Sequence, residues 1–296
     1  MYLLIVFPGN EALGDWLAAH PGIELGKVHL HRFPDGEQLV RVEEEVTGRQ
    51  VLILCTLHEP DKVILPLLFL AGLLKQKGAM QVLLIAPYLA YMRQDKAFHA
   101  GEAVTSDYFA RLISQWFDVL ITIDPHLHRH HYLSELYTIP AFSLHAEMVI
   151  AQYIHEHIHR PILIGPDAES EQWVSRIAQL AKCGFMILHK KRLGDEEVEI
   201  QLPASDLTRN FSPVIVDDIF SSGETLAVTI DLVLKEGWPP PYCIGVHGLF
   251  AGNAWEMLQK RGASQIITTN SVPHVTNGID VSGLLLEKLA QLSEPL

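Results

Sequence analysis

Short, almost uninterrupted runs of apolar and β-branched residues recur along the chain at wide spacing. A run without polar alternation is typical of a strand that is buried on both faces of a parallel sheet. The pattern predicts strands over Leu3–Phe7, Val51–Cys55, Val82–Ala86, Val119–Ile123, Ile162–Ile164, Phe185–Leu188, Val214–Val216, Ile244–Val246 and Ile266–Thr268.

Segments with the apolar spacing of helices separate these runs. The clearest are Lys62–Lys77, Ser106–Trp116 and Thr225–Lys235, and a glycine follows the first and third within two residues, as is common after a helix. Strands that alternate with helices indicate an α/β fold with mostly parallel sheets. Because nine strands are many for one such sheet, we expect two domains that join near Pro140–His145.

One segment breaks this pattern. Tyr88–Thr105 follows a predicted strand but is polar and carries charges of both signs. It is longer than the about 2–6 residues of an ordinary connection, and long loops are usually functional.

The balance of acidic and basic residues argues against one class of function. The chain has 296 residues, of which 35 are acidic and 22 basic, so its formal net charge is −13. This excess argues against a protein that wraps nucleic acid, which needs a basic surface. Charged residues make up 19% of the chain, below the usual value of about 25%, which agrees with surface buried between subunits.

The cysteines and the apolar runs indicate the compartment. Cys55, Cys183 and Cys243 are widely spaced and form no metal-binding pattern, so we expect free thiols in a reducing compartment. No apolar run approaches the about 20 residues of a membrane span, and the N-terminal residues do not resemble a signal peptide. We therefore expect a cytoplasmic protein with no membrane partner.

The segment Pro213–Leu226 (PVIVDDIFSSGETL) carries the sharpest chemistry. A buried strand ends in Asp217 and Asp218, and a turn of small residues leads into a helix expected near Thr225. Backbone N–H groups at such a turn bind anions, and the carboxylates can accept hydrogen bonds from sugar hydroxyls or help hold Mg²⁺. A ribose 5-phosphate site requires this combination. The alternative is a capped strand–helix turn with two solvated acids.

This segment resembles the phosphoribosyl diphosphate (PRPP) loop of type I phosphoribosyltransferases and of ribose-phosphate diphosphokinases, also called PRPP synthetases. The rest of the chain favours the second family, because stretches similar to its motifs follow in family order over nearly the whole chain. They are RFPDGEQLVRV (Arg32–Val42), YMRQDK (Tyr91–Lys96), IDPH (Ile123–His126), GPDAES (Gly165–Ser170), LHKKR (Leu188–Arg192), HGLFAGNA (His247–Ala254) and TTNSVP (Thr268–Pro273). The resemblance implies two phosphoribosyltransferase-like domains, 1–142 and 143–296, with a last helix at about 282–296 that packs back on the first.

Enzymes of this family transfer the diphosphoryl group of ATP to the anomeric hydroxyl of ribose 5-phosphate and release AMP and PRPP. The resemblance implies that ATP is held by Phe33, Asp35, Gly36, Glu37, Arg93 and Gln94. It implies catalytic roles in neutralising phosphate charge for Lys190, Arg192 and Arg93. It places ribose 5-phosphate at Arg192, Asp217, Asp218, Ser221, Ser222, Gly223, Glu224 and Thr225.

Three of these stretches also have a purely structural interpretation. The PDGE stretch can be a turn between two short strands, RQD a solvated charged loop, and KKR the solvated end of a strand.

The resemblance also implies Mg²⁺, with His126 and Asp167 as ligands and Asp124 close by. Because Mg²⁺ prefers oxygen ligands, the histidine depends on the resemblance alone. The alternative is zinc or a histidine-rich metal carrier, suggested by the histidines of one loop, namely His126, His128, His130 and His131.

Three departures from the family pattern bear on function. First, the family's DT(A/G)GT loop here reads SSGET and so contains an acid, Glu224. Second, Glu169 and Ser170 stand where the family has a pair of glycines. Third, Phe142 stands where the family has an aspartate. We expect a Mg²⁺-dependent ribose-phosphate diphosphokinase of a divergent subgroup, in a homo-oligomer built from dimers, with a hexamer as one option. The alternatives are a non-catalytic regulatory homologue, which Glu224 favours, and a type I phosphoribosyltransferase, which needs neither FPDGE nor RQDK.

Overall fold

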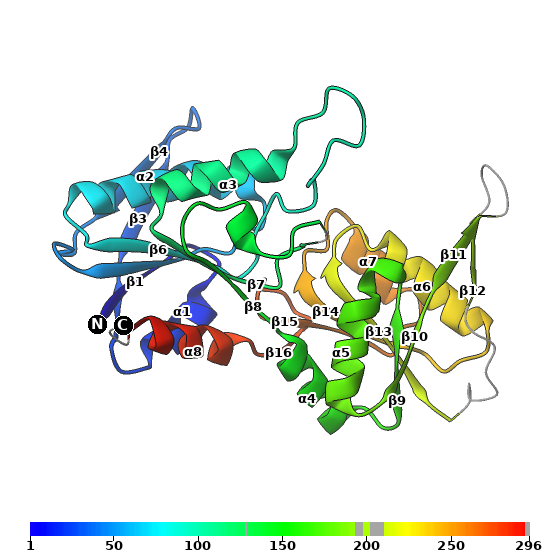
Figure 1. Ribbon diagram of the computed structural model, residues 1–296. Coiled ribbons are helices and arrows are strands. Elements are labelled where there is room, and N and C mark those ends of the chain that lie inside the picture. Colours follow the sequence, from blue (N-terminus) through cyan, green and yellow to red (C-terminus); the bar gives the residue numbers. More distant parts are fainter. Residues whose placement is uncertain (128, 193–197, 202–209, 294–296) are drawn as a thin grey trace. The chain divides into compact units, whose positions relative to one another are not determined.

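The computed structural model describes residues 1–127, 129–192, 198–201 and 210–293, without the side chains of 189–192, 198–201 and 293. Two compact units make up the chain (Figure 1). The first contains Met1–Leu144 and the C-terminal segment from Ser282, and the second contains His145–Val281. Within the described ranges, no helix combines the length and apolar character needed to cross a bilayer.

The first unit is built on a six-stranded parallel sheet of order β2-β1-β5-β6-β7-β8. Side chains of β5, β6 and β7 are buried on both faces, which is why their sequences are continuously apolar. The strands are β1 (Tyr2–Val6), β2 (Ile23–Gly26), β5 (Gln50–Leu54), β6 (Gln81–Ala86), β7 (Val119–Ile123) and β8 (Ala141–Leu144).

Helices cover both faces of this sheet. Figure 1 shows α2 (Pro60–Gln76) and α3 (Thr105–Trp116) on one face, and α1 (Glu11–Ala18) and α8 (Ser282–Ser293) on the other. Helix α8 contacts α1, the Tyr2 hydroxyl donates to the Leu289 carbonyl (3.4 Å), and the Lys288 ammonium lies 3.7 Å from the centre of the Phe142 ring. The C-terminal helix is thus part of the first unit.

An antiparallel hairpin, β3 (Val28–Arg32) and β4 (Gln38–Val42), lies beside this sheet and contacts α2. The short 3₁₀ helix η1 (Leu133–Glu135) contacts β8.

The second unit repeats the plan with a parallel sheet of order β10-β9-β13-β14-β15-β16. Its core joins β13 and β14 to α6 through Ile215, Cys243 and Ile230. The strands are β9 (Pro161–Gly165), β10 (Gly184–Ile187), β13 (Ser212–Phe220), β14 (Tyr242–Gly248), β15 (Gln265–Thr269) and β16 (Asn277–Ile279). The helices are α4 (Glu147–His157), η2 (Ala168–Ser170), α5 (Glu171–Ala181), α6 (Glu224–Lys235) and α7 (Ala254–Gln259), and a hairpin pairs β11 (His189–Arg192) with β12 (Val198–Gln201).

The predicted α/β class with parallel sheets is confirmed, and every predicted strand is present. The apolar pattern did not predict β2, β8 and β16, because edge strands are short and partly exposed and so lack a continuous apolar run. Strand β13 also continues to Phe220, four residues past the predicted end at Val216.

Candidate active site

The predicted sugar-phosphate loop lies between β13 and α6. Gly223, which precedes α6, has a φ of +76°, in the left-handed region that glycine adopts without a Cβ clash. A Cβ at this position would lie 3.0 Å from Leu258 Cδ1 and 3.1 Å from Met257 Cε. Conformation and close packing therefore both favour glycine. Ser222, Glu224 and Thr225 are exposed around it.

Two carboxyl groups lie next to this loop. Asp217 is partly buried, and its loss of water contact raises the pKa of its carboxyl well above the usual range. The charges of Asp218 and Asp167 raise this pKa further, while the Asp218 N–H, which donates to Asp217 Oδ1 (2.9 Å), opposes the rise. Asp217 is therefore not a fully solvated acid. Bound hydroxyl donors or a cation would favour its charged form.

A second turn supports the loop, and the sequence assigned it no role. After β14, the N–H groups of Leu249 and Phe250 donate to the Phe220 carbonyl (2.9 and 3.0 Å), and that of Ala251 donates to the Ser221 carbonyl (3.1 Å). The motif HGLFAGNA identified this stretch, but nothing in its letters indicates which backbone it holds.

Asp167 immediately precedes η2, and its hydrogen bonds fix the turn after β9. Its Oδ1 accepts from the Ser170 N–H (3.0 Å), and the Ser170 hydroxyl donates to the Asp167 carbonyl (2.7 Å). A Cβ on Gly165 would lie 2.6 Å from Ser170 Oγ, so this glycine leaves room for the serine that replaces a family glycine. Ser170, which departs from the family pattern, thus stabilises the turn that contains Asp167 by two hydrogen bonds.

Lys190 and Arg192 stand at alternate positions of β11, paired with Ile200 and Val198 of β12. Their side chains lie outside the described part of the chain.

The FPDGE stretch forms the tight end of the β3–β4 hairpin. The Phe33 N–H donates to the Glu37 carbonyl (2.8 Å), the Gly36 N–H donates to the Phe33 carbonyl (2.9 Å), and Gly36 has a φ of +97°. Asp35 Oδ1 accepts from the Glu37 N–H (3.1 Å). A turn between two short strands is therefore the local structure, and it leaves Phe33 40% exposed.

Arg93 and Gln94 follow β6 at the start of the long predicted loop, which contains no helix or strand before α3. Arg93 is exposed, whereas Gln94 contacts the start of α3: its carbonyl accepts from the Ser106 N–H (3.4 Å) and its side chain from the Thr105 hydroxyl (3.3 Å). Asp95 pairs with Arg129 (3.3 Å). The RQD stretch is thus anchored and is not a fully solvated loop.

The remaining predicted metal ligands lie in both units. Asp124 follows β7 with a φ of +34°, and its N–H donates to the Leu144 carbonyl (2.9 Å). Asp124 is 9% exposed and His126 is partly buried in the first unit, while Asp167 belongs to the second.

The residues fit Mg²⁺ in chemistry. Two of the predicted ligands, Asp124 and Asp167, offer the carboxylate oxygens that Mg²⁺ prefers, and the charge of Asp167 adds to the rise in the pKa of the Asp217 carboxyl. Among the described residues, no group of three or more His, Cys, Asp or Glu side chains is placed to hold a metal ion.

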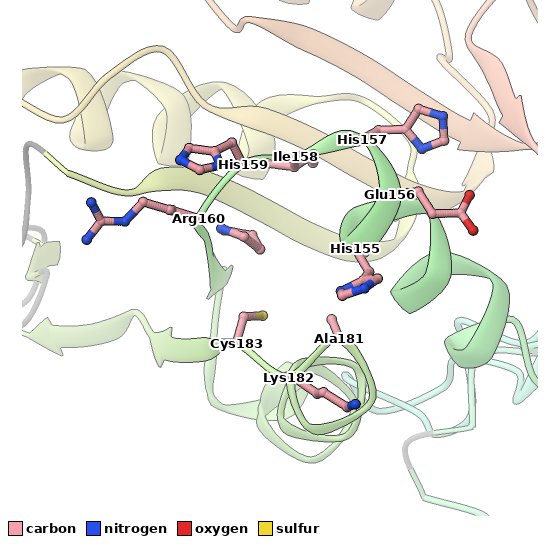
Figure 2. Close-up of a pocket in the computed structure, with 10 residues that line it drawn as sticks. His155, Glu156, His157, Ile158, His159, Arg160, Ala181, Lys182 and Cys183 are labelled. Carbon is pink, nitrogen blue, oxygen red and sulfur yellow. The ribbon is translucent and has the colours of Figure 1, made fainter.

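A groove of about 460 Å³ lies in the second unit, at the C-terminal ends of α4 and α5. Figure 2 shows the side chains of His155 and Cys183 among those that line it. It lies at the amino ends of β9 and β10, whereas ligands of open parallel sheets bind at carboxyl ends. Burial raises the pKa of Cys183 to about 11, which makes its thiol a weak nucleophile near neutral pH. The groove is therefore separate from the predicted site.

Two family models cover most of the chain. The N-terminal domain of ribose phosphate pyrophosphokinase matches residues 2–116, and the phosphoribosyl transferase domain matches residues 133–282. Pyrophosphokinase is another name for the diphosphokinase above.

Individual relatives agree with these models. A ribose-phosphate pyrophosphokinase of Methanobrevibacter smithii is 33% identical, over 89% of this chain and 93% of its own. One of Methanopyrus kandleri is 32% identical, over 98% of this chain and 100% of its own. The crystal structure of phosphoribosylpyrophosphate synthetase from Mycobacterium smegmatis, 21% identical over 98% of both chains, has the same fold with a TM-score of 0.86. The chain therefore belongs to the ribose-phosphate pyrophosphokinase family, as its motifs predicted.

Proposed function

We propose that this protein is an active ribose-phosphate pyrophosphokinase, which transfers the diphosphoryl group of ATP to ribose 5-phosphate. The observation that carries the proposal is the loop between β13 and α6, where a tightly packed glycine turn meets two carboxylates. Family membership supports the reaction. The match to the N-terminal model favours it over a type I phosphoribosyltransferase, because residues 2–116 contain FPDGE and RQD.

In the proposed reaction, the anomeric hydroxyl oxygen of ribose 5-phosphate attacks the β-phosphorus of ATP, and the hydroxyl proton is released to solvent. The bond from that phosphorus to the oxygen shared with the α-phosphate breaks, and AMP leaves. Such transfers depend on positioning and on neutralising phosphate charge. We assign this task to Lys190, Arg192 and Arg93.

The other residues bind the two substrates. Asp217, supported by Asp218, accepts hydrogen bonds from the ribose hydroxyls. The loop that contains Gly223 binds the 5-phosphate through its backbone N–H groups and the hydroxyls of Ser221, Ser222 and Thr225. ATP is bound by Phe33, Asp35, Gly36, Glu37, Arg93 and Gln94.

Mg²⁺, held by Asp124, His126 and Asp167, would offset the negative charge of the ATP phosphates. Its carboxylate ligands account for part of the acidic excess of the chain.

We also propose a cytoplasmic homo-oligomer built from dimers, in which the β3–β4 hairpin of one subunit reaches the ATP site of another. The exposed apolar side chains of this hairpin, Phe33 at 40% and Leu39 at 43%, support an interface there. The net charge of −13 supports the absence of a nucleic-acid partner, because such a partner needs a basic surface.

The activity is tested with purified protein, ATP, Mg²⁺ and ribose 5-phosphate, by following AMP. We expect AMP from the wild type and a much lower turnover, with little change in ribose 5-phosphate affinity, for Lys190→Ala. Wild type and Lys190→Ala that are equally inactive would contradict the proposal and favour a regulatory homologue.

A further inference from the structure

The loop that carries Arg93 contains a strained tyrosine two residues before it. Tyr91 has a φ of +59°, in the left-handed region that is unfavourable for a large side chain. Such a conformation persists only where surrounding contacts hold it, and it is frequent at functional sites.

Two helices hold Tyr91 in this conformation. Its hydroxyl donates to a carboxylate oxygen of Asp61 in the first turn of α2, and its ring lies 4.8 Å from the ring of Phe109 on α3. The hydrogen bond to Asp61, with burial and the charge of the carboxylate, raises the pKa of Tyr91, so the hydroxyl remains a donor.

The residues on both sides of Arg93 are fixed as well. Met92 is 2% exposed, and its Sδ accepts a hydrogen bond from the Tyr137 hydroxyl (3.7 Å). Gln94 accepts hydrogen bonds from the first residues of α3. Arg93 itself is exposed. The turn therefore holds both neighbours of Arg93 by contacts within the first unit, while Arg93 is exposed.

Glycine would adopt this φ without strain, so the backbone alone does not require a tyrosine. A tyrosine adds a tether from the loop to α2 and α3, which a glycine lacks. Pre-organised cations bind phosphates better than mobile ones, because less freedom is lost on binding.

We propose that Tyr91 and Asp61 are positioning residues for ATP: their hydrogen bond locks the turn that aims Arg93 at the ATP phosphates. The inference rests on the proposed function and deepens it, because it adds two residues that act on ATP only through Arg93.

The test compares Tyr91→Phe, which removes only the hydroxyl, with Asp61→Ala and the double variant. The matched control is Tyr108→Phe, because Tyr108 is a tyrosine of α3 that is 62% exposed. Calorimetry measures ATP affinity, steady-state kinetics measure both KM values, and hydrogen exchange follows the amides of residues 92–95.

Tyr91→Phe and Asp61→Ala should each weaken ATP binding about tenfold, as for loss of a hydrogen bond to a charged group. The double variant should be no worse than either single one, and Asp61→Asn, whose amide oxygen can accept, should restore part of the affinity. Amides 92–95 should exchange faster, while the KM for ribose 5-phosphate and the values for Tyr108→Phe stay at wild type.

Unchanged ATP affinity in Tyr91→Phe, or additive effects in the double variant, would overturn the inference. So would a parallel rise of both KM values with faster exchange across the first unit, which marks a general structural role. A wild type that forms no AMP contradicts the proposed function instead, and the calorimetry still decides whether Tyr91 positions an ATP-binding residue.

Discussion

Glycines of nearly equal conformation stand at the two ends of α6, and replacing each with alanine separates backbone strain from loop packing. Gly223 precedes the helix with a φ of +76°, and Gly237 follows it with a φ of +77°. An alanine in the left-handed region costs about 1–2 kcal/mol at either position. At Gly237 a Cβ meets no atom within 4 Å, so this cost is the whole effect.

At Gly223 the added Cβ also meets Leu258 at 3.0 Å and Met257 at 3.1 Å. Both side chains must shift by a few tenths of an ångström, and crowding of this kind adds about 1 kcal/mol or more. The turn that binds the 5-phosphate in our proposal moves with them. Gly223→Ala should therefore be the less stable variant and the only one that binds ribose 5-phosphate more weakly.

The measurements are thermal unfolding without ligand and the KM for ribose 5-phosphate. Each kcal/mol should lower the melting temperature by about 2–4 °C. We expect Gly237→Ala to lose stability at wild-type KM, and Gly223→Ala to lose more stability and to show a raised KM. If Gly223→Ala retains the wild-type KM, the loop does not bind the phosphate. If it melts like the wild type, the packing argument is wrong.

Three further predictions concern charge. Asp217→Asn should raise the melting temperature without ligand and abolish AMP formation, because the amide removes a carboxyl whose pKa burial and neighbouring acids raise. As the pH rises above about 3.9, the pKa of an aspartate in the unfolded chain, ionisation of Asp217 should destabilise the folded wild type. Asp217→Asn has no such group and should not show this loss. Equal dependence of the melting temperature on pH in the two proteins would show that the charge of Asp217 is not the cause. Glu224→Gln should lower the KM for ribose 5-phosphate by up to about fivefold, since an exposed carboxylate beside the loop repels phosphate, and an unchanged KM would mean that Glu224 points away. Cys183, with a pKa raised to about 11, should react with iodoacetamide at pH 8 about two orders of magnitude more slowly than in the unfolded chain, and an equal rate measured by mass spectrometry would contradict its burial.

How well the sequence predicts the candidate site differs between its parts. The Ser221–Thr225 turn was predicted from a strand, two acids and small residues, and it lies where expected, with the helix one residue early at Glu224. The support from Leu249–Ala251 was not predicted, because its hydrogen bonds join residues about thirty positions apart. The strain at Tyr91 could not be predicted either, since no local pattern distinguishes a tethered tyrosine from an ordinary loop residue.

The sequence by itself determined the α/β class, the central strands and the family. Strands buried on both faces must be continuously apolar, and the motifs are contiguous, so both signals are local. Only the tertiary structure decided the edge strands β2, β8 and β16, the raised pKa of Asp217 and the tether between Tyr91 and Asp61. The physical reason is that these features depend on contacts between distant residues and on loss of water, which the chain acquires only when it folds.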